Sequence, residues 1–342
     1  MKKKVTIRDV AKYAGVSRTT VSYVVNGVNK ISEETREKVF QAIKDLQYQP
    51  DFTAISLTKK KSNIIGVILP ATNDSLAPIF KQNHYYNEIL AGLEYVFRKQ
   101  NYDLLFSALR EPEDCKNWVI KRNLDGLIFL NQFPENLYLE MKNLDIPIVL
   151  ADCYEKHANQ YHNIKIDDEL GGYLATKHLI DKGHTHISFV GHDLTNISID
   201  MKRFSGYKKA LEEAGLTVDE NLLFDGRGSY FDIGYEMGLK LLGVEKKTTA
   251  IFACSDILAV GIIKALSEQG KEIPKDYSIV GYDDIVLSNY SLPSLTTIRQ
   301  DVFNKGVICA QTLINTIETK TLELKNITLP IELVVRKSTR NL

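Results

Sequence analysis

The stretch VTIRDVAKYAGVSRTTVSYVVNG, residues 5–27, decides the architecture of the first part of this 342-residue chain. Thr6 can cap a short helix in which apolar residues recur at helical spacing from Ile7 onward. Gly15 can end that helix because its backbone enters the left-handed region at little cost, and Ser17 can cap a second helix directly after it. Two short helices joined by a tight, glycine-containing turn predict a helix-turn-helix.

A third helix completes the predicted head. Ser32 can cap it, Glu33 and Glu34 suit the positive end of its dipole, and an apolar stripe runs from Val39 to Leu46. A three-helix domain that merely packs would show the same pattern. That alternative leaves unexplained why the second helix presents arginine, threonine, serine and tyrosine on its outward face.

Those outward groups can meet base edges and phosphates in the major groove of double-stranded DNA. We therefore expect the head to bind DNA through the second helix and the positions around it. The candidate contacts are Thr6, Ile7, Ser17, Arg18, Thr19, Ser22, Tyr23, Asn26, Lys30, Ser32 and Thr35.

The charge distribution supports this expectation, although the net charge of the chain is zero. Residues 1–61 carry 13 Lys and Arg against 6 Asp and Glu, a net charge of +7. The remaining 281 residues carry 30 against 37, a net charge of −7. A basic head on an acidic body indicates that the head meets a polyanion, although a solvated basic tail would show the same asymmetry.

Composition excludes several other classes of protein. Hydrophobic residues make up 44% of the chain and charged residues 25%, which is ordinary for a globular protein. No run approaches the roughly 18 apolar residues of a membrane span, and the start lacks the apolar region of a secretion signal. The four cysteines are far apart and form no CxxC, which favours free thiols in a reducing cytoplasm.

From residue 63 the pattern changes to short apolar segments that alternate with helical ones. Near-continuous apolar strands separated by helices predict an α/β body of two doubly wound parallel sheets. Ligands of such sheets bind at the carboxyl ends of the strands, here between two lobes. The expected strands are 64–70, 102–108, 125–130, 146–152, 163–167, 186–191, 222–226, 250–256 and 277–284.

The head motif, followed by ISEETREKV and LQYQP, closely resembles the LacI/GalR (lactose-repressor) family of bacterial transcriptional regulators. The likeness returns near the end of the chain as SIVGYDD, LTTIRQD and LPIELVVRKST. It therefore spans the whole chain. Members of this family are helix-turn-helix dimers whose affinity for a palindromic operator is controlled by a small effector, usually a sugar or a nucleobase.

The resemblance implies a division into head, hinge and body. The head covers 1–48, the hinge helix lies within 49–62, and the body is a periplasmic-binding-protein-like effector and dimerisation domain at 63–342. In the hinge, Leu57 matches a leucine that wedges between base steps in the minor groove, with Ala54 packed beside it. The body would interleave an N-lobe of about 63–163 plus 294–325 with a C-lobe of about 164–293 plus 326–342.

The expected effector site lies where strands of the two lobes end. Asp152 and Asp283 end strands, and Arg203 is expected to open a helix. Carboxylates and an arginine suit sugar hydroxyls, which both donate and accept hydrogen bonds. The resemblance maps Arg203 and Asp283 onto the family's main effector contacts, maps Asp152 and Ser255 onto lesser ones, and expects an aromatic platform near residues 229–231, for which Tyr230 is favoured.

Two departures from the family pattern affect recognition of the operator. The position of Tyr23 often holds an arginine, and that of Asp51 commonly holds an asparagine. The usual operator sequence is therefore not assumed.

Other functions receive less support. A histidine group at 178, 184, 186 and 192 has no cysteine or acid at ligand spacing, so we expect no metal, and no cofactor motif is present. No paired catalytic groups indicate an enzyme. The chain is thus interpreted as a cytoplasmic, homodimeric repressor of a carbohydrate-utilisation operon, with no membrane partner. A corepressor- or phosphoprotein-dependent catabolite regulator is the alternative, and a sugar-binding protein of transport is the rival from another class.

Overall fold

The computed structural model describes most of the chain, in ranges separated by short gaps. The described residues are 5–25, 28, 30–49, 61–70, 76–109, 111–192, 194, 198–226, 230–244, 248–320 and 323–342. The chain divides into two units, Met1–Asn63 and Ile64–Leu342, which are called the head and the body below.

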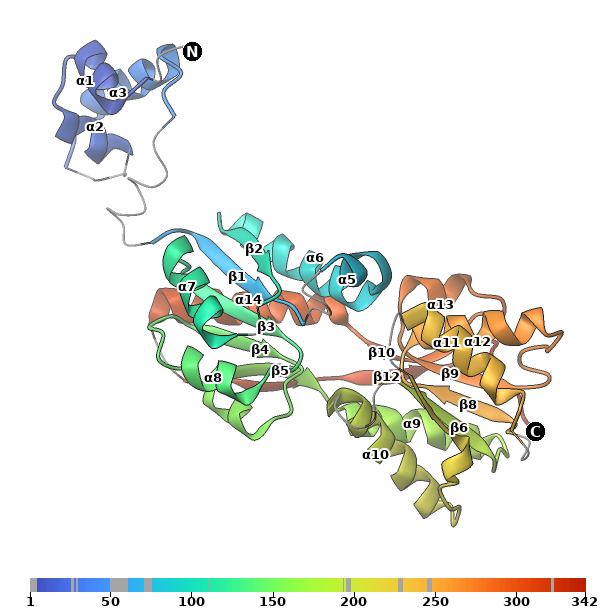
Figure 1. Ribbon diagram of the computed structural model, residues 1–342. Helices are drawn as coiled ribbons and strands as arrows, with labels where there is room; N and C mark the ends of the chain where they lie inside the picture. The colour runs from blue at the N-terminus through green and yellow to red at the C-terminus, as the bar shows by residue number, and fades with distance from the viewer. Residues whose placement is uncertain are drawn as a thin grey trace. The chain divides into compact units, whose positions relative to one another are not determined.

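Residues 5–25 and 30–49 of the head form three helices, labelled in Figure 1 as α1 (Ile7–Ala14), α2 (Arg18–Val25) and α3 (Glu33–Asp45). Gly15 adopts φ 67° and ends α1 as the sequence predicts. One side chain from each helix is fully buried in the core they share: Val10, Val21 and Val39. The predicted helix-turn-helix is therefore confirmed.

The body contains two lobes, each built on a six-stranded sheet among the described residues. The sheet of the N-lobe is entirely parallel. In spatial order its strands are β11 (Asn326–Leu329), β5 (His162–Ile166), β4 (Ile148–Ala151), β3 (Gly126–Leu130), β1 (Ile64–Ile68) and β2 (Asp103–Ser107).

The sheet of the C-lobe is parallel except at one edge, where β12 runs antiparallel to β10. This strand corrects the prediction of purely parallel sheets. In spatial order the strands are β12 (Ile331–Val334), β10 (Thr296–Gln300), β9 (Ser278–Asp283), β8 (Ala250–Ala253), β6 (Ile187–Gly191) and β7 (Leu223–Asp225).

The chain crosses between the lobes a few residues later than expected each time. It leaves the N-lobe sheet after Ile166, returns after Gln300, and crosses again at Pro330, between β11 and β12. Residues 296–300 therefore belong to the C-lobe sheet and 326–329 to the N-lobe sheet, the reverse of the expected assignment. These two strands are short and rich in polar residues, so pairing with β9 and β5 defines them better than their sequence does.

Helices cover both sheets, as Figure 1 shows. In the N-lobe they are α5 (Ala77–Gln82), α6 (His84–Lys99), α7 (Pro112–Arg122), α8 (Glu135–Met141), η1 (Lys156–Gln160) and α14 (Val302–Thr319). In the C-lobe they are α9 (Asp168–Asp181), α10 (Ser198–Glu213), η2 (Glu220–Leu222), α11 (Tyr230–Leu241), α12 (Asp256–Glu268) and α13 (Val286–Tyr290). None of the described helices is long and apolar enough to cross a membrane.

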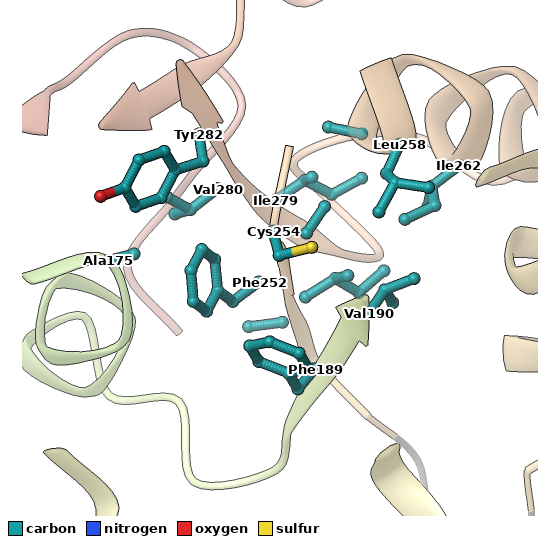
Figure 2. Close-up of a cluster of buried hydrophobic side chains, with 14 of the residues drawn as sticks. Ala175, Phe189, Val190, Phe252, Cys254, Leu258, Ile262, Ile279, Val280 and Tyr282 are labelled. Atoms are coloured by element: carbon teal, nitrogen blue, oxygen red, sulfur yellow. The ribbon is translucent and has the colours of Figure 1, made fainter. Parts of the chain in front are cut away.

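Apolar side chains fill the space between each sheet and its helices. Figure 2 shows the C-lobe core, with Phe189 and Phe252 on the side of the sheet that faces Ala175 of α9. Leu258 and Ile262 of α12 lie on the opposite side. Both faces of the sheet are therefore buried, as doubly wound sheets require.

Candidate functional site

Capping groups position the helices of the head. The Asp9 carboxylate accepts hydrogen bonds from the Thr6 N–H at 2.9 Å and the Thr6 hydroxyl at 2.7 Å. The Ser17 hydroxyl accepts from the Thr20 N–H at 3.0 Å, and Ser32 accepts from Thr35 in the same way. These bonds satisfy donors that the first turn of a helix leaves without a partner.

The predicted DNA-contacting side chains of α2 lie on the surface of the head. Arg18, Thr19 and Tyr23 are exposed, whereas Ser22 is half-buried. Among the other candidates, Thr6, Ser17, Lys30 and Ser32 are exposed, Ile7 and Thr35 are half-buried, and Ile7 packs against the core. Asn26, Ala54 and Leu57 lie outside the described residues, as does the side chain of Tyr230.

In the body, buried polar groups gather where strands of the two lobes end. Asp152 follows β4, Asp283 ends β9, and Gln300 ends β10. Asp152 and Asp283 have φ values of 56° and 111°, in a region that few residues other than glycine, asparagine and aspartate adopt. All three side chains are buried.

Lys305 of α14 supplies the positive charge on the N-lobe side. Its side chain is fully buried, and its ammonium group donates to both oxygens of Asp152, at 2.8 and 2.7 Å. The Tyr85 hydroxyl, on α6, donates to the same carboxylate. Asp152 is thus held by two helices of its own lobe.

Arg203 supplies the positive charge on the C-lobe side. Its Nε donates to Asp168 at 2.7 Å, its Nη2 lies 3.6 Å from Asp283, and its Nη1 donates to the Cys254 carbonyl. The guanidinium carbon lies 3.5 Å from the centre of the Tyr282 ring. Arg203 is in the second turn of α10, which corrects the expectation that it opens the helix.

A glycine on α9 lets Arg203 reach this position. A Cβ atom on Gly172 would lie 2.0 Å from the Arg203 carbonyl oxygen, so any other residue would push α10 away. The close approach sets the guanidinium beside Asp168 at the start of α9. The sequence DELGG therefore contains both the counter-charge of Arg203 and the glycine that allows the contact.

Gln300 joins the two sets. Its Nε2 donates to Asp283 at 2.6 Å, and its Oε1 accepts from Lys305 at 2.7 Å. The result is one chain of polar contacts from α6 in the N-lobe to α9 in the C-lobe, buried except at the half-buried Tyr85. We call this set the interlobe network; its members are Tyr85, Asp152, Lys305, Gln300, Asp283, Arg203 and Asp168.

Burial and charge act against each other in this network. Burial raises the pKa of Asp283 to about 6, although Arg203 and the Gln300 hydrogen bond favour its ionised form. Burial also disfavours the Arg203 cation, but Asp168 and Asp283 outweigh it and hold the pKa of Arg203 well above its ordinary value. The network therefore depends on each charge having its partner.

The predicted effector residues do not all take the same role. Asp152, Arg203 and Asp283 lie in the interlobe network. Ser255 is buried and caps α12 by accepting a hydrogen bond from the Leu258 N–H at 3.4 Å. The next residue, Asp256, accepts hydrogen bonds from Ser288, Thr297 and the Ile285 N–H.

Sequence reasoning missed four members of the network: Tyr85, Asp168, Gln300 and Lys305. The sequence contains one feature that could have identified Lys305. It occupies the buried stripe of α14, in line with Val302, Cys309 and Leu313. A lysine among apolar residues of a core-facing stripe indicates a buried partner, since lone buried charges are costly.

The histidines considered for metal binding have separate roles. His184 is buried and bonded to Thr249 at 2.9 Å and Ser278 at 3.0 Å. His178 lies 3.0 Å from the Thr339 hydroxyl, and burial lowers its pKa to about 4. His192 lies instead beside Asp200 and Cys254, which the spacing along the sequence did not reveal.

Comparisons with known proteins agree with this architecture. The model of bacterial regulatory proteins of the lacI family matches residues 6–51, and that of the periplasmic binding protein-like domain matches 176–339. The transcriptional repressor PurR of Histophilus somni is 36% identical over 98% of this chain and 99% of its own length. The lac repressor dimer bound to operator and the anti-inducer ONPF superposes with a TM-score of 0.85, at 29% identity over 99% and 100% of the two chains. The transcriptional regulator CelR in complex with cellobiose gives 0.73, at 28% identity over 98% and 100%.

A helix-turn-helix head and a periplasmic-binding-protein-like body define the class: a DNA-binding regulator with an effector domain. The chain belongs to the lacI family of bacterial regulatory proteins. It is a sequence-specific transcriptional regulator and not an enzyme, since the PurR relative, a transcriptional repressor, matches it over nearly the whole of both chains.

Proposed function

We propose that this regulator is a cytoplasmic repressor of a carbohydrate-utilisation operon and that a sugar-like effector controls its affinity for the operator. The observation that carries the proposal is the interlobe network. Its buried carboxylates, guanidinium, ammonium and amide make one continuous connection between the lobes. A ligand that replaces these contacts changes how the lobes are held together.

The chemistry of the network suits a neutral polyol. Each sugar hydroxyl donates one hydrogen bond and accepts others, so it can satisfy a carboxylate and a cation at once. Asp152 and Asp283 offer acceptors, and Arg203 and Lys305 offer donors. The CelR relative is seen with a disaccharide, which supports this class of ligand. We also propose that Ser255 and Tyr230 of the C-lobe contact the effector.

The response needs only a difference in affinity between two arrangements of the lobes. Such coupling is typically about 1–3 kcal/mol. We propose that the hinge carries it to DNA, with Leu57 wedged in the minor groove beside Ala54 when the operator is bound. A short helix is marginal alone, so a small change at the lobes is enough to release it.

We also propose that the regulator acts as a homodimer on a palindromic operator. Large apolar side chains are exposed on and after α13: Val286 is 60% exposed, Tyr290 79% and Leu292 88%. Exposed apolar groups gathered in this way are typical of protein interfaces. A second copy that covers them would place two heads on two half-sites.

Operator titration with and without ligand tests the proposal. The full chain would be titrated onto operator DNA in the presence of each member of a panel of neutral sugars. We expect one sugar to weaken binding, and Asp283→Asn to keep operator affinity while losing that response. Asp284→Asn is the matched control, because Asp284 pairs with Arg299 and Arg336 outside the network.

The same titration distinguishes the alternatives. A ligand that tightens operator binding would make the effector a corepressor. An Asp283→Asn chain that responds at wild-type sugar concentrations would show that the effector site lies elsewhere.

A further inference from the structure

The C-lobe contains a second polar cluster, outside the interlobe network. His192 follows β6, Cys254 follows β8, and Asp200 lies in the first turn of α10. Strands β6 and β8 are neighbours in the sheet, so the residues after them emerge side by side. Figure 2 shows Cys254 at the end of its strand, in the core that Val190 also lines.

The three side chains bring different ligand atoms together. His192 Nδ1 lies 3.4 Å from Asp200 Oδ2 and 3.8 Å from Cys254 Sγ. All three atoms lie within 4.8 Å of one another. A tetrahedral zinc ion with ordinary bond lengths would separate nitrogen from oxygen by about 3.4 Å and nitrogen from sulfur by about 3.6 Å. The two observed distances, 3.4 and 3.8 Å, fit this geometry with only small movement.

The cluster is also held rigidly and shielded from water. Asp200 Oδ2 accepts a hydrogen bond from the His192 backbone N–H at 2.7 Å, which fixes the carboxylate toward the imidazole. The side chains of His192 and Asp200 are 11% and 5% exposed, and Cys254 is fully buried. Ligands held in place by their surroundings bind a metal without a large cost of ordering.

The charges would balance when a metal binds. A thiolate and a carboxylate together carry two negative charges, which match a divalent cation, and the neutral imidazole completes the set. The nearby guanidinium of Arg203 is neutralised separately by Asp168 and Asp283. When the Cys254 thiol releases its proton to solvent, a buried 2+ ion and its three protein ligands are therefore neutral together.

We propose that His192, Asp200 and Cys254 form a binding site for a divalent transition metal of the zinc class, with a water molecule as the fourth ligand. The site would act on the effector-binding lobe through Arg203. Asp200 lies one turn before Arg203 on α10, and the Cys254 carbonyl accepts a hydrogen bond from its guanidinium. A bound ion would fix both contacts and hold Arg203 in its present position.

Cobalt(II) is the probe, because a tetrahedral cobalt site with a thiolate ligand has strong visible bands and a sulfur-to-metal charge-transfer band in the near ultraviolet. The full chain, reduced and stripped of metal, would be titrated with cobalt(II). We expect both sets of bands to saturate at one equivalent and to disappear when zinc is added. The charge-transfer band should be lost in Cys254→Ser and kept in Cys115→Ala, which removes a buried thiol from the N-lobe core.

A second measurement keeps the proposal open to refutation if Cys254→Ser does not fold. His192→Gln retains the buried thiol and should weaken cobalt binding at least tenfold, with the circular dichroism spectrum unchanged. Bands typical of six-coordinate cobalt, saturation that Cys254→Ser does not alter, or equal affinity in His192→Gln would each show that the cluster is held by hydrogen bonds alone.

Discussion

The head and the body place their functional residues in opposite environments. In the head, Arg18, Thr19 and Tyr23 are exposed on one short helix, and capping bonds that span three residues hold that helix in place. In the body, the interlobe network is buried, and its Lys305–Asp152 pair joins residues 153 positions apart. An exposed site built from near neighbours tolerates the loss of one member. A buried site built from distant residues is more sensitive, because removing the counter-ion of a buried charge leaves that charge without compensation.

Lys305→Met should give the largest effect and tests the buried side of this comparison. The substitution leaves Asp152 buried without its cation, which costs about 3–5 kcal/mol in comparable cases. We expect the body to unfold at lower denaturant concentration. The chain has a single tryptophan, Trp118 of the N-lobe, so its fluorescence follows the unfolding of the lobe that contains the pair.

A double variant separates lost charge compensation from lost packing. Lys305→Met with Asp152→Asn removes both charges and should recover most of the lost stability, since a neutral pair needs no counter-ion. If Lys305→Met unfolds at the same denaturant concentration as the wild type, the buried Asp152 does not need Lys305 as its counter-ion.

The same comparison explains what the sequence could predict. The helix-turn-helix follows from Thr6, Gly15 and Ser17, because capping and helical periodicity act over three or four residues. Strands β1 to β9 follow from apolar runs, and Asp152 and Asp283 follow from their place at strand ends. Each of these signals is contained in a short segment of the chain.

The rest depends on pairing across the fold. The chain crosses from the C-lobe to the N-lobe between β10 and α14. This crossing brings Gln300 next to Asp283 and Lys305 next to Gln300. Strand β12 runs antiparallel to β10, and only Pro330 separates it from β11 of the other lobe. The four residues of β12 contain no pattern that predicts this direction. Long-range contacts of this kind leave at most an indirect trace, such as a lysine in a buried stripe.

Arg18→Ala tests the exposed side of the comparison, with an intermediate effect. Arginine can form a bidentate contact with guanine in the major groove, so its loss should cost about 1–3 kcal/mol at the cognate operator. Binding to random DNA should weaken much less, and the thermal stability of the head should not change. Operator and random duplexes titrated at one salt concentration would measure both.

Lys44→Ala is the matched control for Arg18→Ala, because it removes one exposed positive charge from α3 of the same head. Any loss of affinity caused by Lys44→Ala should be the same for operator DNA and for random DNA. Equal weakening by Arg18→Ala on both duplexes would reduce Arg18 to a phosphate contact.

The pH dependence of the stability of the body is the smallest of the expected effects. Asp256 is fully buried between α12, α13 and β10, and burial together with the charge of Asp283 raises its pKa to about 8. In the unfolded chain the same carboxyl has its ordinary value of 3.8. Between these values the folded state holds a proton that the unfolded state has released, so folding takes up a proton and stability falls as pH rises. The slope is about 1.4 kcal/mol per pH unit while only the folded carboxyl is protonated, and it flattens above pH 8.

Asp256→Asn isolates this contribution. An asparagine can keep an oxygen toward Ser288 and the Ile285 N–H, while its amide donates to the Thr297 hydroxyl, so the local bonds can be preserved. The thermal midpoint of the body in the wild type should fall more steeply between pH 5.5 and 7.5 than that of the variant (a window set by the two pKa values above). Subtracting the two profiles removes the groups that do not interact with Asp256, whereas Asp283, whose charge raises the pKa of Asp256, contributes to the difference. Parallel profiles would mean that Asp256 is ionised in the folded body, its charge stabilised by the three donors that surround it.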